Sequence, residues 1–256
     1  MIKFFREIRQ RLLRENRISK YVLYALGEII LVVVGILIAL QIGAWNEDFV
    51  NREKEAELLH DLCVDYMETK NRLEKTIVSQ GKAVHYSRRI LELYEKDALH
   101  LKRDSISEFV VRGALSWWRA EPITSTYETM ISTGNIDLLQ DADLKRKLAE
   151  FHTEWSSGFE DHEASLDLLS ILTEDIREHP LFLNDEAIRK DIGLQSIDPL
   201  KRDADISLEV VERLKHKHSF FNTLFLRLSF EVNRLHMQKK MLAFVDETLE
   251  ILACEK

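Results

Sequence analysis

The side chains that could do chemistry are few and scattered along this chain. Cys63 and Cys254 are its only cysteines, and outside the cytoplasm they could form a disulfide. His60 lies three positions before Cys63, but two ligands make no metal site. His216 and His218 are two residues apart, so on a helix they point to different faces. Because no phosphate loop, dinucleotide fingerprint or paired nucleophile and base accompanies them, we expect no catalytic residues, no cofactor, no metal and no enzymatic activity.

One carboxylate, Glu28, lies inside a strongly apolar segment. An ionised group in lipid costs a few kcal/mol, about 3, so it usually faces protein or water. Small residues at spacings that let helix backbones approach closely share this segment: Gly27, Gly35, Ala39 and Gly43. Together with Glu28 they predict a helix–helix interface in the membrane. The alternative is that Glu28 lies near the cytoplasmic surface, pairs with Lys20 or an interfacial arginine, and has no further role.

The element that must carry these residues is a transmembrane helix over residues 20–45. Residues 29–40 are unbroken apolar, and Tyr21, Tyr24 and Trp45 stand where interfacial aromatic residues are common. Residues 21–45 would extend about 37 Å as a helix, which crosses a hydrocarbon core of about 30 Å. A cleaved signal peptide is the alternative, but its apolar region would be only about 7–15 residues long.

Charge indicates the orientation of this helix. The net charge is −8 for the chain, +5 for residues 1–20 and −1 for Glu28, which leaves −12 on residues 46–256. Basic residues favour the cytoplasmic flank, so the N-terminus should be cytoplasmic and residues 46–256 should lie across the membrane. Residues 1–18 predict a basic amphipathic helix in the lipid interface, with anionic lipid as its partner; a frayed basic tail is the alternative. The acidic remainder argues against nucleic acid as a partner.

Residues 46–256 are expected to be all-α, because the whole chain has only three prolines and eight glycines and its apolar residues recur with helical spacing. The transmembrane helix should continue as a stalk as far as Lys96, with Gly81 as its weakest point. Two short helices, about 105–113 and 122–133, should end at Gly113 and Gly134. Asp141 should cap a helix that reaches about Glu178.

The last helix should run from Asp205 to about Leu252. Its predicted buried face has heptad spacing with two polar members: Leu214, His218, Phe221, Phe225, Leu228, Val232, Leu235, Lys239 and Leu242. Three long helices of this kind predict an antiparallel bundle with short connecting helices. Trp117 and Trp118 are interpreted as core anchors beneath a loop, and His162 as a core histidine with its polar atoms satisfied.

Two segments resemble a family of uncharacterised bacterial single-span membrane proteins, domain of unknown function 6090. One runs from Ser19 to Glu47 and contains the dipeptide Gly27-Glu28; the other runs from Ser125 to Phe151 and contains the pair Thr126-Tyr127. Where that family tends to have Tyr-Tyr, this chain has Phe151-His152. The resemblance implies a bacterial inner (cytoplasmic) membrane protein with a helical periplasmic domain, and it implies no activity.

Three functions remain compatible with these observations. The first is a membrane-anchored interaction or scaffold module that forms a homo-oligomer or binds another membrane protein. The second is an envelope sensor or transducer whose helical domain binds a ligand. The third is a channel or proton-linked subunit that uses Glu28. We favour the first, because the small residues around Glu28 provide a face for helix association.

Overall fold

The computed structural model describes residues 18–158, 162–177, 189–190, 192–195 and 211–254. The chain divides into two compact units, Met1–Glu57 and Leu58–Lys256. Every described element is a helix, which confirms the all-α fold class. The predicted interfacial helix at residues 1–18 and the predicted helix start at Asp205 lie outside the described residues, apart from Ile18.

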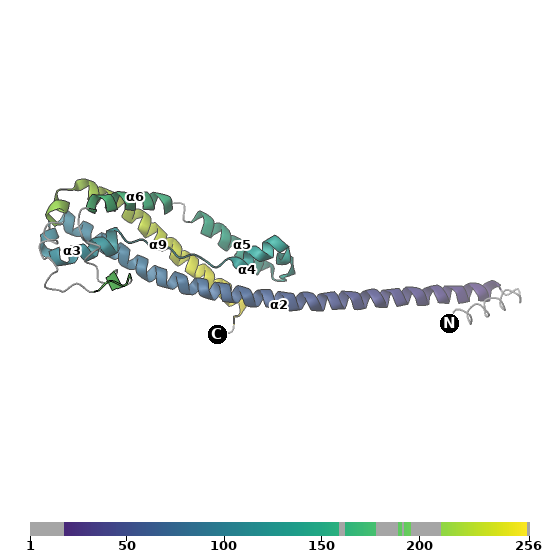
Figure 1. The fold of residues 1–256 in the computed structure, drawn as a ribbon. Helices are drawn as coiled ribbons and strands as arrows, with labels where there is room; N and C mark the ends of the chain where they lie inside the picture. Colours follow the sequence, from purple (N-terminus) through teal and green to yellow (C-terminus); the bar gives the residue numbers. More distant parts are fainter. Residues whose placement is uncertain (1–17, 159–161, 178–188, 191, 196–210, 255–256) are drawn as a thin grey trace. The chain divides into compact units, whose positions relative to one another are not determined.

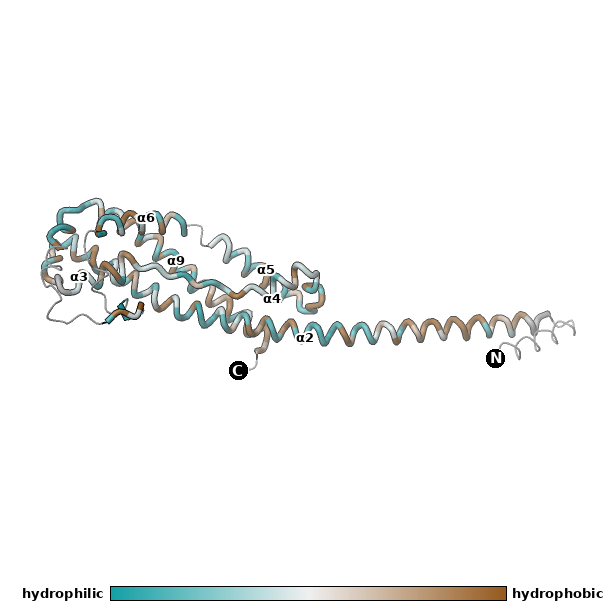
Figure 2. Tube along the Cα trace, viewed as in Figure 1, coloured by the Kyte–Doolittle hydropathy of each residue, from teal (hydrophilic) through white to brown (hydrophobic). Residues whose placement is uncertain are grey.

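The first unit contributes the N-terminal part of α2, a single α-helix from Ile18 to Glu95. It contains the one helical stretch in the described residues that is long and apolar enough to cross a membrane. None of its most apolar 18-residue window is buried, and Figure 2 shows the corresponding hydrophobic run along α2. Gly81 does not interrupt α2, which ends one residue before the predicted limit at Lys96. A helix that exposes such a surface needs a nonpolar environment or a partner helix.

The second unit contains the rest of α2 followed by shorter helices and a long final helix (Figure 1). The elements after α2 are η1 (Leu99–Lys102), α3 (Arg103–Phe109), η2 (Val110–Ala114), α4 (Ser125–Thr133), η3 (Asn135–Leu138), α5 (Ala142–Ser157), α6 (His162–Ile176) and α9 (His218–Leu252). The predicted helix from Asp141 to Glu178 is therefore two helices, and α5 ends against Gly158. Asp141 caps α5 as predicted, since its carboxylate accepts from the backbone nitrogens of Asp143 and Leu144.

Contacts along α9 give the direction in which it packs. From its C-terminal end toward its N-terminus, α9 meets successively later residues of α2: the Cys63–Cys254 disulfide, the Gln80–Glu231 hydrogen bond and the stacked rings of Tyr94 and Phe221. The helices α5 and α6 meet α9 in the same reversed order, through Lys147–Glu247, Ser165–Glu231 and Lys217–Asp175. Thus α9 runs antiparallel to α2 and to the α5–α6 pair.

The apolar core of this unit lies in two clusters. One surrounds Tyr66, Leu148 and Met241, and the other surrounds Ile90, Leu172 and Phe221. Along α2, α6 and α9 most of the buried residues between the clusters are polar, with Ala83 and Val84 as the apolar exceptions. The polar ones are Gln80, Ser87, Ser165, Arg227, Glu231, Arg234 and Gln238. The bundle therefore carries a polar layer between two apolar layers.

The predicted apolar face of the last helix is right at Leu214 and Phe221, which are buried, but it follows the wrong side of α9 from Phe225 onward. Phe225 is 63% exposed and Val232 is 40% exposed. The buried face keeps heptad spacing but lies one residue away: Phe220, Phe221, Leu224, Arg227, Glu231, Arg234, Gln238, Met241, Val245 and Thr248. Heptad positions chosen for their apolar side chains miss a buried face whose central positions are charged. Those charges can be buried only because other helices supply hydrogen-bond and ion-pair partners.

The helical stretch ends at Ala114, one residue past the predicted end, but Gly113 is not its cap. Gly113 lies inside η2, a π-helical turn, where a Cβ atom would stand 2.7 Å from the backbone nitrogen of Ser87. Glycine is needed there because α2 approaches closely, and not because a helix stops. Gly134 does end α4, with φ +74° in the left-handed region, as predicted.

Candidate functional site

The small-residue face of the first unit is open in the structure. A Cβ atom built on Gly27, Gly35 or Gly43 would have no neighbour within 4 Å, and Ala39 is exposed. Glu28 is partly buried and lies only about 20° around the helix from Gly35 at about 100° per residue. Ala39 and Gly43 follow Gly35 at steps of about 40°, so these residues and Glu28 lie on one side of α2 with space for the close approach of a second helix. Gly27 lies about 160° around the helix from Gly43, so the structure does not place it on the same side.

The two cysteines are joined in the structure. Cys63 on α2 and Cys254, just after α9, form a disulfide with an S–S distance of 2.03 Å and a Cα–Cα distance of 5.8 Å. These residues are 191 positions apart in sequence. The disulfide therefore connects the C-terminal end of α9 to the first turns of α2 within the second unit.

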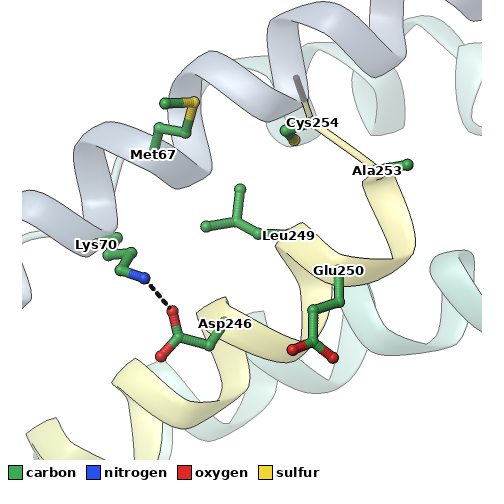
Figure 3. Close-up of a pocket in the computed structure, with 7 residues that line it drawn as sticks. All are labelled: Met67, Lys70, Asp246, Leu249, Glu250, Ala253 and Cys254. Atoms are coloured by element: carbon green, nitrogen blue, oxygen red, sulfur yellow. Dashed lines mark ion pairs between the residues drawn. The ribbon is translucent and has the colours of Figure 1, made fainter. Parts of the chain in front are cut away.

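A cleft of about 610 Å³ lies beside this disulfide (Figure 3). Met67, Leu249 and Ala253 give it apolar lining, and Lys70 forms an ion pair with Asp246 at 2.6 Å. That hydrogen bond with Asp246 raises the pKa of Lys70, so the lysine is a cation at neutral pH. Because the cysteine of this cleft is oxidised, the lining offers no thiol nucleophile.

The polar layer of the second unit is built around Glu231. Its carboxylate accepts hydrogen bonds from Gln80 Nε2 on α2, Ser165 Oγ on α6 at 2.6 Å, and two arginines of α9. Arg227 Nη2 lies 3.1 Å and Arg234 Nη1 lies 3.0 Å from Glu231 Oε1. All three charged side chains are at most 3% exposed. One carboxylate therefore connects three helices in the interior of the unit.

The same arginines hold the chain segment that follows η2. Arg227 donates to the carbonyl oxygens of Ala114 and Ser116, each at 2.6 Å, and Arg234 donates to the carbonyl oxygen of Trp118 at 2.7 Å. This segment has no regular secondary structure, so its carbonyl groups need hydrogen-bond donors from elsewhere. The guanidinium groups supply them, which explains why charged residues occupy core positions of α9.

Burial is the main influence on the protonation of these groups. It lowers the pKa of both Arg227 and Arg234, while the charge of Glu231 opposes that change. Both side chains remain cations at neutral pH, because a guanidinium starts from a very high pKa. The layer thus contains two buried positive charges and one buried negative charge.

Two aromatic predictions near this layer need correction. Trp117 is only partly buried and its Nε1 has no hydrogen-bond partner, while Trp118 is 45% exposed. His162 was expected to have its polar atoms satisfied, yet its shielded Nδ1 has no partner. Burial is the largest cause that lowers the pKa of His162, followed by the charges of Arg119 and Arg234. The two tryptophans are therefore not fully buried anchors, and His162 is not a core histidine with all its polar atoms satisfied.

A second aromatic contact involves the pair at Phe151-His152. Phe151 is buried against the ring of Tyr66, with centroids 5.3 Å apart, and His152 stacks on Tyr127 with centroids 3.9 Å apart. Burial lowers the pKa of His152, against the opposing charge of Glu128. Both positions therefore keep ring contacts although neither residue is a tyrosine.

Sequence reasoning named the cysteines as a possible disulfide and predicted an interface on the small-residue face, and it missed the Glu231 layer. No local motif marks it, because its members come from α2, α6 and α9 and are separated by up to 151 residues. The one available signal was the heptad spacing of Arg227, Glu231, Arg234 and Gln238. Among the described residues, no group of three or more His, Cys, Asp or Glu side chains is placed to hold a metal.

Comparison with known proteins identifies the family of this chain but no individual relative. No curated protein and no solved structure matches the chain. A family profile matches residues 28–156, which begin at Glu28 and stop one residue before the end of α5. The chain therefore belongs to the family of unknown function DUF6090.

Proposed function

We propose that this protein is a single-pass, membrane-anchored interaction module that self-associates through the small-residue face of α2. The observation that carries the proposal is that this face is open in the apolar stretch of the helix, with free space above Gly35 and Gly43. In lipid, helices associate by close backbone packing and interhelical hydrogen bonds, and Glu28 on the same face adds a polar group to such a contact. The same face would also accept a different membrane protein.

We propose that the second unit lies in the periplasm of a bacterial inner membrane. Two independent observations support this orientation. The basic N-terminal residues favour the cytoplasmic side of the anchor, where they would contact anionic lipid. The Cys63–Cys254 disulfide belongs to an oxidising compartment. No catalytic activity is part of this proposal.

Self-association is tested by filling the small-residue face with larger side chains that are themselves apolar, so that the segment stays apolar throughout. The full chain, labelled with donor and acceptor dyes in lipid nanodiscs or vesicles, should show energy transfer that depends on the protein-to-lipid ratio. Gly35→Ile and Ala39→Ile should each weaken association about tenfold or more, a change of about 1.4 kcal/mol, because a branched side chain separates the backbones.

Leu37→Ile is the matched control, since residue 37 lies about 160° or more around the helix from Gly35. It should associate like the wild type. A wild-type chain that stays monomeric at all lipid ratios, or isoleucine variants that associate equally well, would contradict self-association through this face.

A further inference from the structure

Four nitrogen atoms at one edge of the polar layer are shielded from solvent and have no hydrogen-bond partner among the described residues. They are Trp117 Nε1, Arg119 Nε, His162 Nδ1 and Arg234 Nε. Two of the side chains come from the irregular segment after η2, one from the first residue of α6 and one from the middle of α9. Distant parts of the sequence therefore converge on this place.

Ring and charge contacts show that these side chains are neighbours. The guanidinium carbon of Arg234 lies 5.1 Å from the centre of the Trp117 ring, and the rings of Trp117 and His162 have centroids 5.0 Å apart. Arg119 is close enough to Arg234 and His162 for its charge to affect both. The four side chains thus form one cluster, which we call the donor cluster.

The donor cluster contains hydrogen-bond donors without acceptors. An indole Nε1 and a guanidinium Nε can only donate, and a neutral imidazole nitrogen donates in one of its two tautomers. A shielded donor with no acceptor costs about 1–3 kcal/mol, and more when it is charged. The shared requirement of the cluster is therefore an acceptor that also carries negative charge.

The protein's own acceptors do not meet this requirement. The nearest buried carboxylate, Glu231, already receives hydrogen bonds from Gln80, Ser165, Arg227 and Arg234. Two amide oxygens of the layer, from Gln80 and Gln238, also lack partners. Their amide nitrogens donate to Glu231 and to the Trp118 carbonyl, and these bonds fix the direction of each amide.

We propose that the donor cluster is a binding site for a small oxyanion, of the chemistry shared by inorganic phosphate and small carboxylates. An oxyanion presents several acceptor oxygens to several donors at once. It also carries the negative charge that this place lacks, since Arg227 and Arg234 share the single carboxylate of Glu231 and Arg119 makes no ion pair among the described residues. Arg234 is 1% exposed and supplies a rigid wall, whereas Trp117, Arg119 and His162 are partly exposed and leave a route from solvent. This site would give the second unit a ligand-sensing role, and it does not depend on self-association of α2.

The test is a calorimetric titration of the full chain in detergent with sodium phosphate, sodium acetate and sodium chloride, at constant ionic strength set with chloride. We expect saturable binding of phosphate or acetate that chloride does not abolish, and the better ligand identifies the source of the oxyanion. Arg119→Gln and Trp117→Phe should each weaken binding about tenfold or more, because each removes one donor of the site. Trp117→Phe keeps an aromatic ring against Arg234 and so retains the fold if Arg119→Gln does not.

Arg112→Gln is the matched control, since Arg112 is a nearby arginine with a half-exposed side chain that pairs with Glu108. It should bind like the wild type. The proposal is overturned if neither oxyanion binds saturably, if chloride binds equally well, or if Trp117→Phe and Arg119→Gln bind as the wild type does.

Discussion

At the scale of single residues, the carboxylate of Glu231 connects α2, α6 and α9 through its hydrogen bonds. It is 3% exposed and, within the part of the chain that the structure describes, is the only carboxylate in direct contact with the buried guanidinium groups of Arg227 and Arg234. Removing one member of a buried ion pair leaves an uncompensated charge, which costs far more than the net worth of the pair. The arginines also hold the carbonyl oxygens after η2, so a change at Glu231 is transmitted to that segment.

We therefore predict that Glu231→Gln destabilises the protein by about 3–5 kcal/mol. The amide keeps the shape of the side chain but removes its charge and one of its two acceptor oxygens. Urea unfolding in detergent, followed by circular dichroism, measures the change. Glu250→Gln is the control, because Glu250 is an exposed carboxylate on the same helix and should change stability by less than about 0.5 kcal/mol. Equal midpoints for the two variants would refute this account of the layer.

At the scale of elements, the close contact between α2 and η2 depends on one missing side chain. Gly113 is buried, and its Cβ position would lie 2.7–2.9 Å from three atoms of Tyr86 and Ser87, two of which are backbone atoms. Backbone atoms in the middle of a long helix cannot move aside as a flexible side chain does. Gly81, five residues before Tyr86 on the same helix, has no such neighbour within 4 Å.

The two glycines should respond to alanine in opposite directions. Gly113→Ala should destabilise the protein by about 1–3 kcal/mol through overpacking. Gly81→Ala should stabilise it by about 0.5–1 kcal/mol, because alanine has a higher helix propensity and the site has room for a methyl group. Thermal unfolding of both variants beside the wild type checks this. Two shifts in the same direction would mean that the contact between Gly113 and α2 is not tight.

Elements differ in how far they could be predicted from sequence. The continuous helix α2 was predictable, because residues 29–40 are uniformly apolar and helical spacing continues without proline up to Glu95. The cap at Asp141 was also predictable, because its partners are its own neighbours in sequence. The buried face of α9 was not, since Phe225 is more hydrophobic than Arg227 and only partners on other helices make burial of the arginine favourable. The donor cluster was missed for the same reason: contacts between Trp117, His162 and Arg234 cannot be inferred from their spacing.

At the scale of the whole molecule, the Cys63–Cys254 disulfide both stabilises the second unit and depends on the redox state of the compartment in which that unit lies. It closes a loop between residues 191 positions apart, which includes most of the second unit. Cross-linking so long a loop restricts the unfolded chain strongly, by about 2–5 kcal/mol for a native disulfide. Cys63 and Cys254 would keep this bond only in an oxidising compartment, so their redox state in cells reports the side of the membrane on which the unit lies.

We predict that neither thiol of the full chain reacts with an alkylating reagent when intact cells are treated before lysis, and that both react after reduction. The oxidised protein should then unfold at a higher urea concentration than the reduced protein, by an amount equal to about 2–5 kcal/mol. The double variant Cys63→Ser, Cys254→Ser is the control, because its unfolding should be insensitive to reductant. If both cysteines were alkylated in cells without added reductant, they would lie in a reducing compartment. That result would contradict the periplasmic orientation that the basic N-terminal residues favour.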